Sequence, residues 1–301
     1  MKLDFKFVFF GTPEFAAIIL EKLIEANFLP QTVVCNPDKP VGRKKIITPP
    51  SVKQSIAHQI SSIKNKIEIL QPEKLDSSIK HRISNIEPDL FIVAAYNKII
   101  PKEFLEIPRF GSIGVHPSFL PKHRGPSPIQ TALLNGDEKT GVTLFLMDEK
   151  VDHGKIISNL KYQISNLDNY ETLMRKLAEL SADLLIETLP KFVKGEITPQ
   201  IQNETMATFT KKFKTEDAFV RFADLKKSMG EGGETAAIIE RKIRAFNPEP
   251  GAFTFSEKNG WPLRIKILDA VLKEGKLVLT KIQPEGKTVI NDLNAIKQYV
   301  D

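Results

Sequence analysis

A histidine and an aspartate carry the clearest chemistry in this 301-residue sequence. His116 ends the apolar run GSIGVH and is followed at once by Pro117, which places its ring at a strand end, where it can face a cleft. Asp152 follows 36 residues later, in MDEKVDHG. A carboxylate beside an imidazole fixes the tautomer of the ring and raises its basicity, as a general acid or base requires. A histidine next to a proline is also common in ordinary loops, so the pair needs further support.

Five motifs around this pair supply that support. They occur in the order HPSFLP, RGPSPIQ, LNGD, TGVTLFLMD and VDHG between residues 116 and 154. The series resembles the active-site region of the enzymes that transfer a formyl group from 10-formyltetrahydrofolate to an amine. The resemblance implies that His116 handles the proton of the attacking amine and that Asp152 supports it. It also implies that 10-formyltetrahydrofolate is the cosubstrate and that it contacts Ser118, Phe119, Leu120, Pro121, Tyr96, Met147 and Asp148.

One position departs from the family pattern. Two residues before the histidine, the family has an asparagine whose carboxamide holds the formyl oxygen as it becomes an oxyanion, and this chain has Gly114 there. Asn97, in AAYNKIIP, stands where the family more usually has glycine. We predict that Asn97 supplies the missing carboxamide as a third catalytic residue. The alternative is that Asn97 only shapes its turn, which is a common use of asparagine.

Three further segments resemble one branch of the family, the methionyl-tRNA formyltransferases. They are GTPEF at 11–15, PDKPVGRKKIITPPSVK at 37–53 and RKIRAFNPEPGAF at 241–253. The resemblance implies that the acceptor is the initiator methionyl-tRNA, that the product serves translation initiation, and that a basic loop enters the tRNA acceptor arm. Two alternatives stay open. One is a formyltransferase acting on an amino-sugar nucleotide or another small amine, and the other is an RNA-binding relative that lost catalysis with the change at Gly114.

Basic residues are concentrated in two regions of a chain whose formal net charge is +6. Residues 36–66 contain seven Lys or Arg against one acid, and residues 208–301 contain 17 basic and 13 acidic residues. Two basic regions on an otherwise mildly acidic chain fit a polyanion that spans both, although a charge run is more often a solvated face. Glycine and prolines in the first region predict an irregular loop. We predict tRNA contacts from Arg43, Lys44, Lys45, Lys211, Lys212 and Lys214.

The composition is ordinary for a soluble globular protein, with 41% hydrophobic and 27% charged residues. The single cysteine, Cys35, excludes an intramolecular disulfide and a cysteine metal cluster. The five histidines lack the spacing of metal ligands, so we predict no metal. The first apolar run, at 7–10, is too short for a signal peptide or a membrane span. We expect a cytoplasmic monomer that does not contact membranes.

Alternating strands and helices predict the fold of the N-terminal part. A doubly wound, mostly parallel α/β sheet of the Rossmann-like kind follows from such alternation, and its ligands bind beyond the carboxyl ends of the strands, where His116 is predicted. Strands are predicted at 5–10, 32–35, 68–70, 89–95, 112–116 and 141–147, and helices at 13–25 (with Thr12 as N-cap and Pro13 as first residue), 51–60, 73–86, 127–134 and 169–189.

The pattern changes in the C-terminal part. Short β runs at 219–222, 251–255, 263–271 and 276–282, with one helix near 235–246, predict a small barrel. The family resemblance implies an OB-like barrel, a fold whose general use is nucleic-acid contact. The predicted organisation is therefore a catalytic domain at 1–189, a linker at 190–207 and an OB-like tRNA-binding domain at 208–301.

Overall fold

The computed structural model describes residues 5–42, 44–58, 67–258 and 261–300. By its internal contacts the chain divides into two compact units. The first unit comprises the described residues of Met1–Gly125, Thr140–Tyr162 and Met174–Phe209. The second comprises those of Pro126–Lys139, Gln163–Leu173 and Thr210–Asp301.

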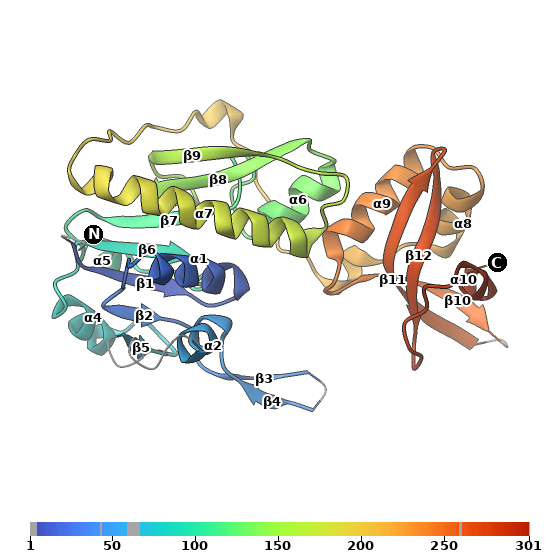
Figure 1. The fold of residues 1–301 in the computed structure, drawn as a ribbon, viewed down its shortest axis with the longest axis horizontal. Coiled ribbons are helices and arrows are strands. Elements are labelled where there is room, and N and C mark those ends of the chain that lie inside the picture. The colour runs from blue at the N-terminus through green and yellow to red at the C-terminus, as the bar shows by residue number, and fades with distance from the viewer. Residues whose placement is uncertain (1–4, 43, 59–66, 259–260, 301) are drawn as a thin grey trace. The chain divides into compact units, whose positions relative to one another are not determined.

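A seven-stranded sheet forms the centre of the first unit (Figure 1). Its strand order is β5-β2-β1-β6-β7-β8-β9. The first five are parallel to their neighbours, and β8 runs antiparallel to β7. This confirms the predicted mostly parallel α/β fold. The strands are β1 (Phe7–Gly11), β2 (Thr32–Val34), β5 (Glu68–Leu70), β6 (Leu90–Ala94), β7 (Ser112–His116), β8 (Lys139–Leu146) and β9 (Ile156–Gln163).

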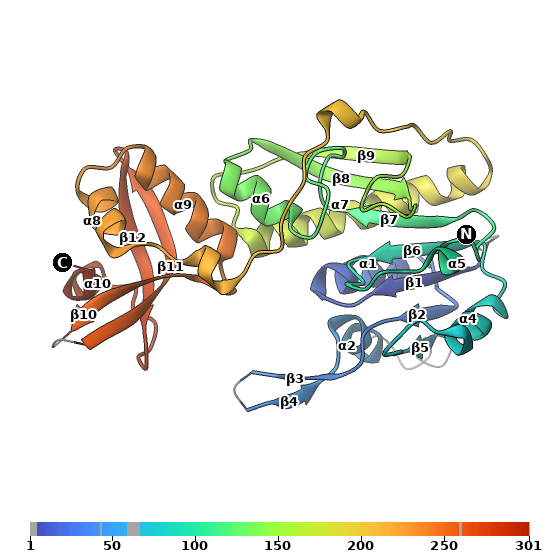
Figure 2. The same ribbon diagram turned by 180° about the vertical axis from the view of Figure 1, so that it is seen from behind.

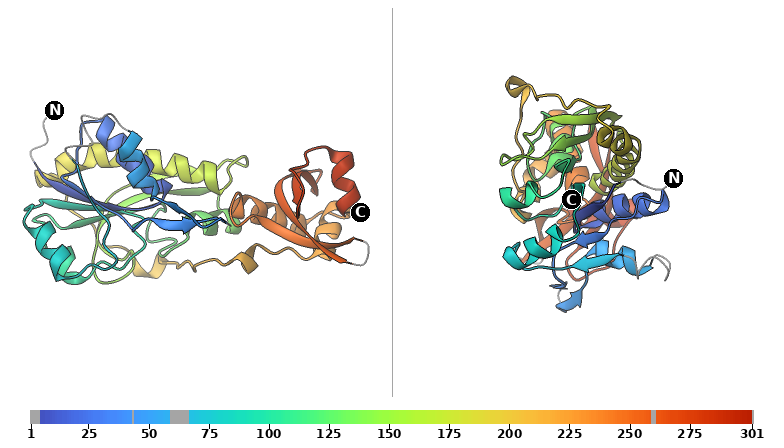
Figure 3. Two further views of the ribbon diagram at one scale, coloured as in Figure 1. Left: turned by 90° about the horizontal axis from the view of Figure 1, so that it is seen from below. Right: turned by 90° about the vertical axis from the view of Figure 1, so that its left-hand side faces the viewer.

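Helices cover both faces of this sheet (Figures 2 and 3). On one face lie α1 (Glu14–Glu25) and α7 (Tyr170–Val193), and on the other lie α4 (Ser77–Ser84) and α5 (Lys102–Leu105). Successive side chains of a strand point to opposite faces. Val8 and Phe10 of β1 therefore pack in one cluster with Ile83 of α4 and Phe104 of α5. None of the helices in the described part of the chain combines the length and apolar character that a membrane span needs.

The first helix begins one residue later than predicted. Its N-cap is Pro13, and the Thr12 hydroxyl makes other contacts. It donates to the backbone oxygen of Tyr96 at 3.4 Å and accepts from the backbone N–H of Asn36 at 3.3 Å. Thr12 thereby ties together the residues that follow β1, β2 and β6, at the carboxyl edge of the sheet.

The basic segment after β2 forms a hairpin, so the predicted irregular loop is wrong. β3 (Lys39–Val41) and β4 (Ile46–Thr48) pair antiparallel and extend away from the sheet (Figure 1). Pro40 is tolerated because a two-stranded ribbon has only edge strands, and Gly42 adopts a φ of 71° in the turn. Lys53 of α2 (Ser51–His58) holds the base of the hairpin, with Nζ 2.9 Å from the Asp38 carboxylate.

α7 continues past its predicted end. It runs through Pro190 to Val193, so the segment from Pro190 is not linker from its first residue. A proline removes one backbone hydrogen bond and tends to break a helix. Here it lies in the last turn, and the helix ends three residues later. The following chain, including the short 3-10 helix η1 (Glu204–Met206), belongs to the first unit as far as Phe209.

A three-stranded antiparallel sheet forms the C-terminal part of the second unit, where the sequence predicted a small β-rich domain of the barrel kind. Its strands are β10 (Ala252–Lys258), β11 (Trp261–Lys273) and β12 (Lys276–Pro284), and single bridges add Phe219 beside β10 and Ile290 beside β12. The predicted strand at 219–222 is wrong beyond Phe219, because α8 starts at Phe222. The other elements of this unit are α6 (Pro128–Asn135), η2 (Thr215–Ala218), α8 (Phe222–Gly230), α9 (Glu234–Phe246) and α10 (Leu293–Val300).

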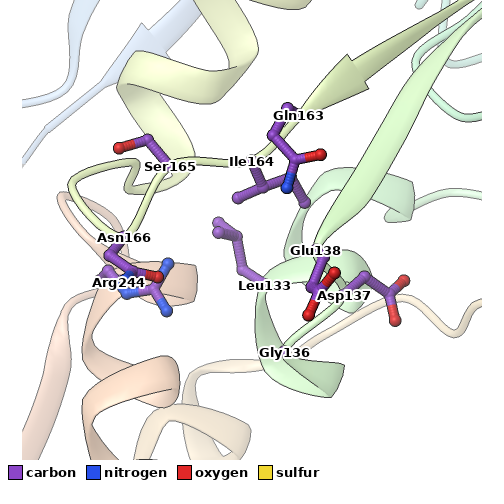
Figure 4. A pocket seen from close by; sticks show the side chains of 9 residues that line it. All are labelled: Leu133, Gly136, Asp137, Glu138, Gln163, Ile164, Ser165, Asn166 and Arg244. Carbon is purple, nitrogen blue, oxygen red and sulfur yellow. The ribbon is translucent and has the colours of Figure 1, made fainter.

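A pocket of about 400 Å³ lies within the second unit (Figure 4). Arg244 of α9 lines it, but its charge is already compensated by Glu240 at 2.6 Å, and it also donates to the backbone oxygen of Asp168. The pocket contains none of the predicted site residues. Its lining is Leu133, Gly136, Asp137, Glu138, Gln163, Ile164, Ser165, Asn166 and Arg244.

Candidate active site

His116 lies buried at the carboxyl end of β7, where the fold predicted it. Its Nε2 is 2.9 Å from the backbone oxygen of His123. Because a carbonyl oxygen can only accept, Nε2 carries a proton and donates it. The other ring nitrogen, Nδ1, lies 3.6 Å from Oδ2 of Asp152. Nδ1 is therefore the nitrogen that can gain or lose a proton, and it does so beside a carboxylate.

Asp152 reaches His116 from a tight turn after β8. Its Oδ2 accepts a hydrogen bond of 2.7 Å from the backbone N–H of Gly125, which fixes the carboxylate on the loop that follows β7. Asp152 itself adopts a φ of 49°, in the left-handed region that non-glycine residues seldom occupy. Gly154 completes the turn, because a Cβ there would lie 1.6 Å from the backbone oxygen of Leu146. The glycine of the VDHG motif is thus required by the geometry of the turn.

The predicted folate-contacting turn is held by a residue that sequence reasoning did not single out. Thr143 of β8 donates its hydroxyl to the backbone oxygen of Ser118 at 2.7 Å and accepts from the backbone N–H of Leu120 at 3.1 Å. The Ser118 hydroxyl donates to the backbone oxygen of Lys122. The peptide bond between Leu120 and Pro121 is cis. Ser118 and Leu120 are buried, while Phe119 is half-buried with Lys161 Nζ 4.9 Å from its ring.

Tyr96 and Met147 come together in one apolar cluster at the carboxyl edge of the sheet. The Tyr96 hydroxyl is buried and has no hydrogen-bond partner among the described residues, and burial raises its pKa to about 12. An orphaned buried donor carries a free-energy cost that a polar ligand could remove. Asp148, the neighbour of Met147, is exposed and lies 2.6 Å from Nδ1 of His153. The predicted folate contacts therefore divide between a buried cluster and an exposed carboxylate.

The comparisons with known proteins agree with this geometry. Residues 5–189 match the family model described as formyl transferase, and residues 233–297 match the model of the formyl transferase C-terminal domain. The chain belongs to the formyl transferase family. It is 40% identical to the methionyl-tRNA formyltransferase of Enterococcus faecalis over 98% of this chain and 97% of that protein. It is 37% identical to the one of Bacillus subtilis, over 94% and 91%.

Solved structures support the fold. The methionyl-tRNA formyltransferase from Clostridium thermocellum aligns with a TM-score of 0.57 at 18% identity, over 96% of this chain and 100% of that one. HypX from Aquifex aeolicus in complex with tetrahydrofolic acid aligns with a TM-score of 0.60 at 16% identity, over 98% of this chain and 47% of that one. At these identities the likeness concerns the fold alone.

Phe145 explains how this formyl transferase accommodates Gly114. The two residues are paired across β7 and β8. A Cβ at Gly114 would lie 2.4 Å from the Phe145 ring and 3.2 Å from Met147 Cγ. The ring therefore occupies the space of the asparagine expected there. Asn97 lies in the exposed turn after β6 with a φ of 63°, a conformation that asparagine adopts more readily than most residues.

The predicted tRNA-binding lysines of this formyl transferase are exposed. Lys44 and Lys45 lie in the β3–β4 turn, whereas Arg43 lies outside the described residues. Three apolar side chains of the hairpin are also exposed: Val41, Ile46 and Ile47. In the second unit Lys211 pairs with Asp217 at 2.6 Å and lowers the pKa of that carboxyl. Lys212 and Lys214 are exposed on the same segment.

Proposed function

We propose that this formyl transferase moves the formyl group of 10-formyltetrahydrofolate to the α-amino group of initiator methionyl-tRNA, for translation initiation. The observation that carries the proposal is similarity to methionyl-tRNA formyltransferases over nearly the whole chain, including a match to the C-terminal domain model. The exposed basic β3–β4 hairpin is consistent with a binding site for an acceptor as large as tRNA. We further propose that the protein acts in the cytoplasm as a monomer.

His116 and Asp152 handle the proton in the proposed reaction. The amine attacks the formyl carbon, negative charge develops on the formyl oxygen, and a proton must leave the nitrogen. Nδ1 of His116 takes that proton, while Nε2 stays fixed on the His123 carbonyl. The Asp152 carboxylate, 3.6 Å away, stabilises the imidazolium that forms. The proton then passes to N10 of the folate as the carbon–nitrogen bond breaks, leaving a formamide and tetrahydrofolate. Acid–base assistance of this kind contributes about 10²–10⁴ in rate.

The oxyanion requires a donor that Gly114 cannot supply. We propose that the Asn97 carboxamide reaches the formyl oxygen when both substrates are bound. One such donor contributes roughly 10²–10³ in rate. β6, which Asn97 follows, lies directly beside β7 in the sheet, so the two strand ends open onto the same edge.

Acceptors of two kinds test this function. Purified protein with 10-formyltetrahydrofolate is given initiator methionyl-tRNA in one reaction and an amino-sugar nucleotide in another, and formylated product is measured in each. Formylation of the tRNA with no product from the sugar is expected. Formylated product from the amino-sugar nucleotide alone would show that the acceptor is a sugar nucleotide and not tRNA. Tight tRNA binding with no product from either acceptor would favour a non-catalytic RNA-binding protein.

A further inference from the structure

The segment from Gln200 to Phe209 contacts the Asp152 turn and also the loop whose His123 carbonyl holds His116. Gln200 forms a two-hydrogen-bond bridge with Ile156, just beyond the Asp152 turn. At the other end, the Thr208 backbone oxygen accepts from the N–H of Arg124 at 2.9 Å, and the Thr208 hydroxyl accepts from the N–H of His123. The segment therefore contacts the loop whose His123 carbonyl holds His116. This segment, which falls mostly in the predicted linker at 190–207, thus forms part of the site's support.

Gln202, inside this segment, contacts the Asp152 turn directly. Its side chain is buried, and Nε2 donates to the backbone oxygens of Asp152 at 2.9 Å and Gly154 at 2.8 Å. Oε1 accepts from Nε of Arg124 at 3.1 Å and from Nη2 at 2.8 Å. An amide side chain offers two donors and two acceptor positions, and Gln202 uses all four.

Arg124 fixes which way the Gln202 amide points. The Arg124 guanidinium is buried, and it also makes hydrogen bonds of 2.9 and 2.7 Å to the two carboxylate oxygens of Glu204. These bonds lower the pKa of Glu204. A guanidinium only donates, so it must face Oε1 of Gln202, and the NH₂ group must then face the two carbonyls. The hydrogen-bond partners therefore allow only one of the two flipped orientations of the Gln202 carboxamide.

The turn that carries Asp152 has a backbone conformation that depends on surrounding contacts. Asp152 adopts a φ of 49°, and a left-handed non-glycine residue persists only where surrounding contacts hold it. The same backbone conformation aims Oδ2 at Gly125 and places it 3.6 Å from Nδ1 of His116. If the turn relaxed, the carboxylate would leave the imidazole.

We propose that Gln202 is a positioning residue for formyl transfer: it holds the Asp152 turn so that the carboxylate meets His116, and Arg124 and Glu204 hold Gln202 in turn. The proposal rests on the proposed function for its kinetic readout. A merely structural role, in which Gln202 only fastens the segment to the first unit, predicts lost stability without a specific effect on the His116–Asp152 pair.

Two variants at Gln202 and two matched controls test the proposal. Gln202→Glu keeps the size and the acceptor for Arg124 but removes both donors, and Gln202→Leu removes every hydrogen bond without adding charge. The controls are Gln200→Glu and Gln200→Leu, because Gln200 is exposed and its side chain donates to the Thr198 backbone oxygen. We expect kcat to fall about 10- to 100-fold for both Gln202 variants, as for a small misplacement of a catalytic group. The KM values for folate and tRNA, and the kcat of both controls, should stay within about 2-fold of wild type.

A double-mutant cycle separates positioning from a general loss of structure. If Gln202 acts through the carboxylate, Gln202→Glu should lower the kcat of the Asp152→Asn variant by less than about 3-fold, because coupled effects do not add. Two results would overturn the proposal. One is that Gln202→Glu lowers the kcat of the Asp152→Asn variant by as much as it lowers that of wild type. The other is that Gln202→Glu leaves the kcat of the protein that keeps Asp152 unchanged.

A measurement without acceptor separates this proposal from the proposed function. The ¹⁵N signals of the His116 ring are followed by NMR through a pH titration of each variant. Both Gln202 variants should titrate as Asp152→Asn does, and the Gln200 variants as wild type does. A wild-type titration in Gln202→Glu contradicts positioning, and so does unfolding of both Gln202 variants. If wild type forms no formylated tRNA, the proposed function fails while the titration still decides the role of Gln202.

Discussion

The chemistry of the site depends on the unequal surroundings of the two nitrogens of one ring. Nε2 of His116 is committed to a backbone carbonyl, and Nδ1 lies beside a carboxylate at a distance longer than a hydrogen bond. The uncharged ring therefore has no donor toward Asp152, whereas the protonated ring gains a favourable charge partner there. This arrangement suits the proposed mechanism, in which Nδ1 of His116 takes up a proton during the reaction.

Removing either member of the pair should slow turnover without weakening tRNA binding. We expect His116→Ala and Asp152→Asn each to lower kcat by at least about 10²-fold, the low end of acid–base assistance. Steady-state formylation and a separate tRNA binding assay measure the two effects. Near-normal turnover in either variant would exclude that residue from the mechanism.

Asn97→Gly tests the proposed oxyanion donor cleanly. Glycine adopts a φ of 63° without strain, so a change in turnover reports on the carboxamide and not on the backbone. We expect a loss of roughly 10²-fold. Adding Gly114→Asn should restore activity only together with Phe145→Leu, because the Phe145 ring fills the space at 114. A silent Asn97→Gly would mean that Asn97 only shapes its turn.

Cys35 should make stability depend on pH in the alkaline range. Burial raises the pKa of its thiol from 9.0 to about 11. Between these values the unfolded thiol is ionised while the folded one keeps its proton, so the unfolded state binds fewer protons and stability falls as pH rises. Urea unfolding from pH 8 to about 11 should show this fall in wild type and a smaller one in Cys35→Ala. If the unfolding free energy fell equally with pH in wild type and in Cys35→Ala, the raised pKa of the buried thiol would be contradicted.

At the scale of elements, the β3–β4 hairpin carries the tRNA prediction. Lys44→Ala with Lys45→Ala should weaken tRNA binding and flatten its salt dependence, because each lost phosphate contact reduces the slope by about 0.7–0.9. The folate KM should not change. Lys191→Ala with Lys194→Ala, at two exposed lysines at the end of α7, removes equal charge as a control. If the two double variants weakened tRNA binding equally, the hairpin lysines would contribute only through the overall charge and not through specific contacts.

Elements with strong local signals could be predicted from the sequence. The strands at 68–70 and 112–116 match β5 and β7 residue for residue, and the glycine that ends α6 adopts the left-handed C-cap conformation. β9 could not be predicted, because its side chains are mostly exposed or half-buried and do not alternate. The hairpin depends on pairing across a glycine turn, which local propensity does not report.

The supports of the site escaped prediction for a different reason. Arg124 is the first residue of the RGPSPIQ motif, but nothing in the sequence links it to Gln202, 78 residues away. Their meeting depends on the path of the segment after α7, which only the folded chain defines. The motifs that carry His116 and Asp152 were visible because the two residues flank recognisable turns.

At the scale of the whole molecule, both sequence regions belong to one enzyme family. Family models match the N-terminal and the C-terminal parts, and relatives of nearly equal length match across the chain. The division with a linker at 190–207 stays a prediction; by internal contacts, the segment as far as Phe209 belongs to the first unit and residues 126–139 belong to the second. Truncation at residue 190 should therefore remove Gln202 and reduce catalysis as well as tRNA binding.

The most direct measurement is formylation of initiator methionyl-tRNA by the purified wild-type protein with 10-formyltetrahydrofolate, beside His116→Ala. We predict N-formylmethionyl-tRNA and an equal amount of tetrahydrofolate from wild type, and at least about 10²-fold less of both from the variant. Absence of formylated tRNA from folded wild-type protein that binds both substrates would contradict the account.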